Sequence, residues 1–262
     1  MSHLLKAFFS DRKRRVFIVV AVLCLIASAG WWGYNRFFSE RANPSIEEYP
    51  IRGIDISAHN GEVDYTRLRG AGVQFAYIKS TEGADFCDRR FMQNATGLRR
   101  AGIPTGAYHF FRFNRDGEMQ AWNFINSLKG RRFQLPPAVD VEEWGNADGV
   151  HVARIRRELR RMLDVLQREG YDPIVYSNKN GYQRYLRGHF DDYPLWICSF
   201  TDPPLDDHRQ PWVIWQYSHR GSVEGISGSV DFNTIHPSHP LAAVVSSLNI
   251  LADSVKCQIP NG

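Results

Sequence analysis

The sequence predicts one α/β barrel, an irregular TIM-like barrel with eight strands and about five helices, behind an amino-terminal transmembrane helix. Three observations predict it. Strand-like and helix-like segments alternate from residue 51 to residue 200, a pattern typical of parallel strands joined by right-handed crossovers. Beyond residue 200 two more strand-like runs are joined by loops alone, which makes the last third irregular. An uncharged run near the amino terminus is long enough to cross a bilayer.

The composition fits one large core and excludes some classes of partner. The chain has 262 residues, of which 43% are apolar, enough for a single barrel domain. Residues 1–50 hold seven Lys and Arg against four acids, so only +1 of the net charge of +4 remains for the rest. We therefore expect no nucleic-acid partner. Four scattered cysteines predict no zinc site, and at most one disulfide among Cys87, Cys198 and Cys257.

The amino terminus resembles a membrane anchor. Four basic residues at 12–15 precede the uncharged run 16–32, which ends in two tryptophans. This polarity predicts a helix that leaves the bulk of the chain outside the cytoplasm. The alternative is a signal peptide cleaved near Ala29, because Ala-Ser-Ala fits the cleavage rule. The expected divisions are a basic cytoplasmic lead, an anchor, a linker and the barrel, at residues 1–15, 16–34, 35–49 and 50–262.

The predicted elements follow one another in barrel order. The expected strands are 51–57, 75–79, 105–111, 137–142, 173–177, 195–200, 212–217 and 230–234. The expected helices are 65–71, 89–101, 116–128, 150–169 and 181–186. The helix at 150–169 has the clearest apolar face, and Gly102, Gly130 and Gly170 stand where helices end. Residues 241–262 form either a last packed segment or a tail.

An acidic pair in the stretch 135–144, LPPAVDVEEW, is the main candidate for chemistry. Because side chains alternate along a strand, Asp140 and Glu142 point to one face, with their backbones roughly 6.5–7 Å apart. Two carboxyl groups within reach of one bond are what a glycosidase needs. The alternative is a structural pair that binds arginines or caps the next helix.

Other polar and aromatic residues fall near the carboxyl ends of the predicted strands, where α/β barrels carry their chemistry. Asp55 ends the first strand and Asp231 stands in the last. The candidates for substrate contact are Tyr77, Lys79, Tyr108, Phe110, Tyr176, Trp196 and Gln216, with Trp144 and Trp215 as further aromatic candidates. For each aromatic, core packing is the alternative. Alternation places His109 towards the helix layer, in a structural role.

Several motifs together resemble a known family. GIDIS, YIKSTEG, NATGLRRAGIPTGAYHFFR, PPAVDVE, PIVYSN, PLWICSF, WQYS and GSVDFN occur in this order. They are similar to glycoside hydrolase family 25, the Chalaropsis-type lysozymes, over about residues 50–236. The resemblance implies an irregular barrel of eight strands and five helices. It also implies hydrolysis of the β-1,4 bond between N-acetylmuramic acid and N-acetylglucosamine in peptidoglycan.

The resemblance places the family's acidic residues on Asp55, Asp140, Glu142 and Asp231. We expect Glu142 to be the general acid, with a pKa raised by the neighbouring charge of Asp140. Asp140 then positions Glu142 or, by analogy with the family, orients the 2-acetamido group of the sugar. Asp55 and Asp231 are neighbours if the barrel closes, and stabilise the transition state, position water or supply a nucleophile. The alternatives are a helix cap for Asp55, a salt bridge at the seam for Asp231 and a surface acid for Glu142.

Three competing functions remain open at this point. A metal hydrolase is disfavoured because no H-x-H or H-E-x-x-H motif occurs, and we expect neither metal nor cofactor. A non-catalytic wall-binding barrel would lack one of the acids, whereas all four are present. A chitinase-like hydrolase shares the paired-acid chemistry. The expected partners are peptidoglycan strands and, through the amino-terminal helix, a membrane.

Overall fold

The computed structural model describes residues 11–38, 42–201, 204–205 and 212–257. The chain divides into two compact units, Met1–Arg41 and Ala42–Gly262. The first unit contains the helix α1 (Asp11–Phe38), in which Arg14–Trp32 is long and apolar enough to span a membrane. A signal sequence near the amino terminus can meet the same criteria of length and composition.

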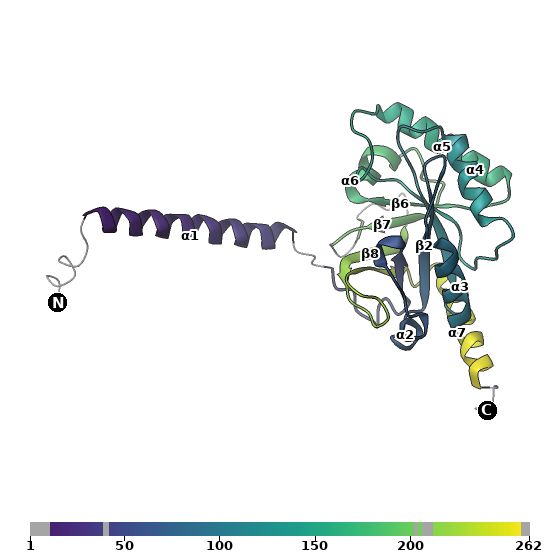
Figure 1. The fold of residues 1–262 in the computed structure, drawn as a ribbon. Helices are drawn as coiled ribbons and strands as arrows, with labels where there is room; N and C mark the ends of the chain where they lie inside the picture. The colour runs from purple at the N-terminus through teal and green to yellow at the C-terminus, as the bar shows by residue number, and fades with distance from the viewer. Residues whose placement is uncertain (1–10, 39–41, 202–203, 206–211, 258–262) are drawn as a thin grey trace. The chain divides into compact units, whose positions relative to one another are not determined.

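The second unit is a closed barrel of eight strands (Figure 1). The strands pair in the order β1-β9-β8-β7-β6-β5-β4-β2, and β1 also pairs with β2, which closes the ring. This confirms the predicted barrel and its strand count. A short β3 pairs only with the end of β2 and was not expected from the sequence. The strands are β1 (Arg52–Ile56), β2 (Phe75–Glu82), β3 (Phe86–Cys87), β4 (Thr105–Phe110), β5 (Ala138–Asp140), β6 (Ile174–Asn178), β7 (Leu195–Cys198), β8 (Trp212–Gly221) and β9 (Val230–Ile235).

The last strand makes the barrel mixed rather than parallel. β9 runs antiparallel to both β8 and β1, while β7 and β8 are parallel. A short connection is sufficient between antiparallel strands, so no crossover helix is needed between β8 and β9. Because β9 runs in the opposite direction, the start of this strand lies at the rim where β1 ends. Asp231 and Asp55 are therefore direct partners in the β1–β9 ladder.

The helices lie close to their predicted positions. They are α2 (Tyr65–Gly70), α3 (Phe91–Ala101), α4 (Gly117–Leu128) and α5 (Val152–Arg168), and the fifth is α6 (Lys179–Gly181) continued by a π-helical turn, η2 (Tyr182–Leu186). A 3₁₀ turn, η1 (Ala58–Asn60), follows β1, with Ser57 as its cap. The side-chain oxygen of Ser57 accepts from the backbone N–H of His59 at 3.2 Å. The helix-cap role considered for Asp55 thus belongs to Ser57.

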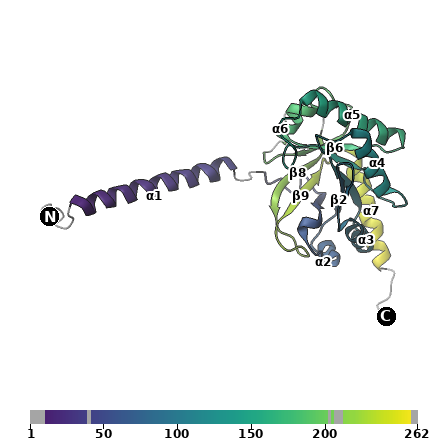
Figure 2. The same cartoon turned by 45° about the horizontal axis from the view of Figure 1, so that its top comes forward.

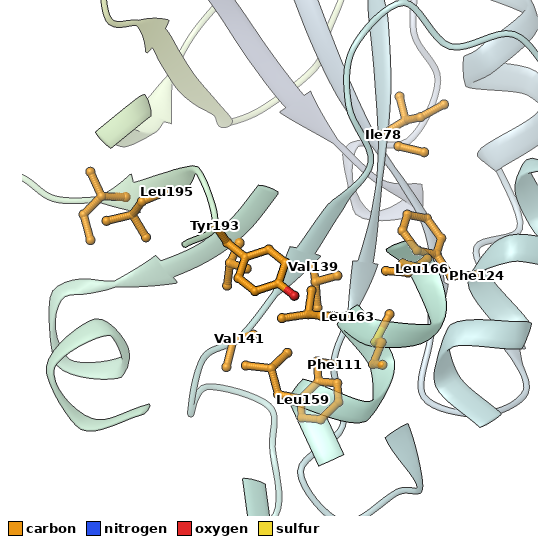
Figure 3. Packing of buried hydrophobic residues seen from close by; sticks show 14 of the residues in the cluster. Ile78, Phe111, Phe124, Val139, Val141, Leu159, Leu163, Leu166, Tyr193 and Leu195 are labelled. Carbon is orange, nitrogen blue, oxygen red and sulfur yellow. The ribbon is translucent and has the colours of Figure 1, made fainter. Parts of the chain in front are cut away.

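Packing of α5 against β5 explains which way the acidic strand faces. Val139 and Val141 are fully buried in the layer between barrel and helices, in the same cluster as Leu159 and Leu163 of α5 (Figure 3). Alternation along β5 then turns Asp140 to the opposite side, into the barrel. The strand ends at Asp140, so the predicted strand end at residue 142 is wrong and Glu142 stands in the loop that follows.

A carboxy-terminal helix, α7 (Pro240–Cys257), closes the other end of the barrel interior. Leu241 and Val245 are buried in one cluster with Ile51, Phe75 and Ile235, which stand at the starts of β1 and β2 and at the end of β9. Both ribbon views show α7 beside α3 (Figures 1 and 2). Residues 240–250 therefore form a packed segment, one of the two alternatives considered for this part of the chain.

The cysteines contribute no disulfide within the described side chains. Cys87 and Cys198 are free thiols, as is Cys24 in α1. The side chain of Cys257, the third candidate for a pair, lies outside those described.

Candidate active site

A cleft of about 440 Å³ opens at the barrel rim where β1, β4, β5 and β6 end. Eleven of the thirteen residues selected from the sequence line it. They are Asp55, Lys79, Tyr108, Phe110, Asp140, Glu142, Trp144, Tyr176, Trp196, Gln216 and Asp231. Residues from all eight strands of the barrel, together with two from the loop after β5, thus meet at one site, as expected for the chemistry of an α/β barrel.

Tyr77 and Trp215 are the two that do not line the cleft. Tyr77 lies two residues before Lys79 on β2, one layer deeper in the barrel, and is fully buried. Its hydroxyl donates to the carbonyl of Pro136 at 3.0 Å, and its ring lies 4.7 Å from that of Trp196. Trp215 is fully buried as well. In this structure both residues belong to the core, the alternative considered for every aromatic.

Asp55 and Asp231 form a pair of acids across the β1–β9 ladder. Asp55 is 8% exposed and shares a side-chain hydrogen bond with Asp231. Burial raises the pKa of Asp55 above its ordinary value of 3.8, while the hydrogen bonds from Asn233, Gln216 and Asp231 favour the charged form and limit the rise. A hydrogen bond between two carboxyl groups needs one proton. The pair therefore shares a proton when the bond is formed.

Two buried amides fix the orientation of Asp55. Gln216 Nε2 and Asn233 Nδ2 both donate to Asp55 Oδ2, at 2.9 and 2.8 Å. The amide oxygens are held in turn, since Tyr176 Oη donates to Gln216 Oε1 at 2.9 Å and Trp196 Nε1 donates to Asn233 Oδ1 at 2.9 Å. Each amide is locked at both ends, which leaves Asp55 little freedom to rotate.

Glu142 has the properties of a proton donor near neutral pH. Burial raises its pKa from 4.5 to about 7, with a smaller contribution from the charges of Asp55 and Glu143 and an opposing hydrogen bond with Asn178. The sequence argument attributes this rise to the charge of Asp140. The direction of the shift agrees with that argument, but its largest cause is removal of the carboxyl group from water.

Asp140 is as deeply buried as Asp55. It is 8% exposed, and burial together with the charge of Glu142 raises its pKa well above the ordinary range, while Lys79 opposes the rise. Among the described atoms its Oδ1 is buried without a hydrogen-bond partner. An unsatisfied buried oxygen is costly, and a donor on a bound ligand would relieve that cost.

Lys79, Glu82 and Arg112 form a polar network in the cleft. Glu82 accepts hydrogen bonds from Lys79 Nζ at 2.6 Å and from Arg112 Nε at 2.9 Å. The YIKSTEG motif thus supplies two members of this network, Lys79 and Glu82, and the motif that ends in HFFR supplies Arg112. Within the described residues no group of three or more His, Cys, Asp or Glu side chains could hold a metal ion.

His109 faces the helix layer, as alternation predicts. It is fully buried, with Nδ1 2.7 Å from Thr81 Oγ1 and Nε2 3.3 Å from Gln120 Oε1. Burial lowers its pKa to about 3, so the imidazole is neutral at physiological pH. This supports a structural role.

A larger groove on the outer surface lacks comparable chemistry. It measures about 1190 Å³ and runs between α2, α3 and residues 223–227. Three acids line this groove, Glu62, Asp64 and Glu224, and all three are exposed. Asp64 caps α2, accepting from the backbone N–H groups of Thr66 and Arg67 at 3.1 and 3.0 Å. The smaller cleft, with its buried acids, is therefore the candidate active site.

Sequence reasoning missed the residues that orient the acids. Asn233 and Asn178, which bind Asp55 and Glu142, stand in the motifs GSVDFN and PIVYSN. Arg112 ends the motif that closes with HFFR. Their presence inside the shared motifs was the available signal.

The comparison with known families decides the identity. The family model "Glycosyl hydrolases family 25" matches residues 54–226. The chain belongs to this family. It is accordingly a glycoside hydrolase, as the motifs predict.

Proteins of similar sequence cover most of the barrel. The protein YegX of Escherichia coli (strain K12) is 32% identical over 234 residues, which is 85% of this chain and 83% of that protein. The "Autolytic lysozyme" of Clostridium acetobutylicum is 35% identical over 70% of this chain and 55% of its own. A solved family 25 glycosyl hydrolase from Bacillus anthracis has a TM-score of 0.70 at 30% identity, over 79% of this chain and 97% of that one. The fold is thus the family's barrel.

Proposed function

We propose that this protein is a muramidase, cleaving the β-1,4 bond between N-acetylmuramic acid and N-acetylglucosamine in peptidoglycan. The observation that carries the proposal is Glu142, a carboxyl in a cleft lined by four further acids, with a pKa raised to about 7. Glycoside hydrolysis needs such a proton donor beside negative charge. The lysozyme name of the clostridial relative supports peptidoglycan as the substrate.

Each acid has a role in the proposed reaction. Glu142 donates its proton to the leaving oxygen, so that the sugar departs as a neutral alcohol. Asp55, oriented by two amides whose hydrogen bonds favour its charged form, stabilises the positive charge that develops on the ring, and Asp231 donates a hydrogen bond to it. Asp140 offers its unpartnered oxygen to the 2-acetamido N–H of the sugar.

The bond cleaved is identified by its products. We expect the purified protein to release fragments from isolated sacculi that carry muramic acid at the reducing end, as shown by mass spectrometry after borohydride reduction. Reducing-end glucosamine would contradict a muramidase. Faster cleavage of chitin than of peptidoglycan would favour the chitinase-like alternative.

The pH dependence follows from the two raised pKa values. Glu142 acts only when protonated, and its pKa is about 7, so kcat/KM should fall as the pH rises above about 7. Asp55 acts only when charged, and its pKa lies above 3.8, so kcat/KM should fall as the pH drops through that raised value. A pH profile measured on soluble glycan fragments tests both limbs. A rate that stays constant up to pH 9 would exclude Glu142 as the donor.

Cleavage of peptidoglycan places the barrel outside the cytoplasm. We further propose that residues 16–34 remain as a membrane anchor, with residues 35–49 as the linker to the barrel. The apolar span Arg14–Trp32 and the basic residues before it support this proposal. The mass of the mature protein isolated from membranes is expected to be that of the uncleaved chain. A mature chain that begins just after Ala29 would instead identify a signal peptide.

A further inference from the structure

Two cations share one carboxylate on the wall of the cleft. Glu82 Oε2 accepts from Lys79 Nζ at 2.6 Å, and Glu82 Oε1 accepts from Nε and Nη2 of Arg112. The hydrogen bonds and positive charges of both partners outweigh burial and lower the pKa of Glu82. The carboxylate is thus charged, and one of the two positive charges has no counterpart in this group of three.

The neighbouring acids do not supply that counterpart near neutral pH. Asp140 and Glu142 are close enough to Lys79 for its charge to oppose the rise in their pKa values. Those pKa values nevertheless remain raised, chiefly because burial disfavours the charged form of both carboxyl groups. The cleft wall formed by Lys79 and Arg112 therefore keeps an excess of positive charge.

The two cationic groups are also fixed in place and accessible. The side chains of Lys79 and Arg112 are 13% and 31% exposed. The Lys79 ammonium and the Arg112 guanidinium each lie 5.0 Å from the ring centre of Phe110, and Arg112 also donates to the carbonyl of Gly145. Both groups retain N–H donors beyond these contacts. Preorganised donors with excess positive charge are suited to bind a carboxylate.

The proposed substrate carries a carboxylate on only one of its two alternating sugars. Muramic acid bears a lactyl group, which ends in a carboxyl group or continues into a peptide that has carboxyl groups of its own. N-acetylglucosamine has neither. We propose that Lys79 and Arg112 form a carboxylate-binding site for the acidic substituent of N-acetylmuramic acid. This inference rests on the proposed function. With muramic acid held at Lys79 and Arg112, only one of the two alternating glycosidic bonds of the glycan strand would lie at Glu142.

The test measures binding in a chain that cannot turn over the ligand. In full-length Glu142→Gln protein, calorimetry compares a GlcNAc–MurNAc tetrasaccharide having free lactyl carboxyl groups with its methyl ester and with chitotetraose. We expect the free acid to bind about tenfold or more tightly than either neutral ligand. Adding Arg112→Gln or Lys79→Gln should remove most of that difference.

A matched control separates the site from general surface charge. Arg115→Gln removes a cation from the same loop, at an exposed position that does not line the cleft, and should preserve the preference for the free acid. Equal affinities for acid and ester, or an equal loss of affinity for all ligands in Arg112→Gln, would overturn the inference. Failure of every muramic ligand to bind, with chitotetraose still bound, would instead overturn the proposed function.

A fourth ligand identifies which carboxylate is bound. In a muramyl dipeptide derivative of the same glycan the lactyl carboxyl is an amide, and the only free carboxylates are those of the peptide. Affinity equal to that of the free acid would place the peptide carboxylate at Lys79 and Arg112. Affinity equal to that of the methyl ester would place the lactyl carboxylate there.

Discussion

Glu142→Gln is expected to lower the rate of peptidoglycan hydrolysis by about 10²–10⁴-fold, the usual contribution of a general acid. Glutamine has the same shape but no proton to give at neutral pH. Glu142 stands in a loop after β5 and is not part of the packed core, so the thermal unfolding midpoint should change little. Turnover measured on soluble peptidoglycan fragments checks the rate.

A substrate that needs no proton distinguishes this role from a loss of binding. An aryl glycoside whose phenol is a good leaving group departs without protonation, so Glu142→Gln should retain far more activity on it than on peptidoglycan. Glu143→Gln is the matched control. Glu143 forms an ion pair with Arg184 at 3.7 Å, and Glu143→Gln should leave kcat intact. Because the charge of Glu143 raises the pKa of Glu142, the variant should lose activity at a slightly lower pH on the alkaline side of the profile. An equal loss on both substrates would remove Glu142 from the donor role.

The convergence of the acids could be predicted because it depends only on strand order. Asp55 follows a buried run and Asp140 lies in another, and the carboxyl ends of parallel strands in a barrel meet at one rim. Asp231 reaches the same rim for a different reason, the reversal of β9. Closure of the predicted barrel was enough to predict that Asp55 and Asp231 are neighbours. The antiparallel direction of β9, which brings Asp231 to this rim, was not predicted from the sequence.

The partners of the acids could not be predicted in the same way. Gln216 and Asn233 are far from Asp55 in sequence, and their hydrogen bonds to it exist only once β8 and β9 flank β1. Burial of Glu142 likewise depends on the loop after β5, where strand alternation no longer applies. Local patterns predict which face a residue takes, whereas the pKa depends on everything that packs around it.

The packing of the carboxy-terminal helix against the barrel could not be predicted from local patterns either. Residues 241–250 are apolar enough for a helix, but the sequence alone does not say that the starts of β1 and β2 leave an apolar surface to cover. In the structure Leu241 and Val245 of α7 fill that place. Tyr77, a candidate for substrate contact in the sequence, lies in the core of this structure. Alternation assigns only a side of the strand and does not encode depth inside the barrel.

Asp55→Asn is expected to lower turnover by about 10²-fold or more, because it removes the charge that faces the developing cation. The fold should tolerate the change. The amide oxygen of asparagine can accept from Gln216 and Asn233 in place of Oδ2, and its N–H can donate to Asp231. Initial rates on soluble peptidoglycan, together with the unfolding midpoint, separate chemistry from stability.

Asp231→Asn provides the decisive comparison for the acid pair. Its amide can still donate to Asp55 and so replace the shared proton, which should make Asp231→Asn the milder of the two substitutions. Asp85→Asn, the same change on an exposed turn outside the cleft, should match the wild-type protein. If Asp231→Asn were the more severe change, Asp231 would be the charged acid that stabilises the transition state. Asp55, oriented by Gln216 and Asn233, would then be the protonated acid that donates the hydrogen bond. Wild-type rates in both variants would exclude the pair from the reaction.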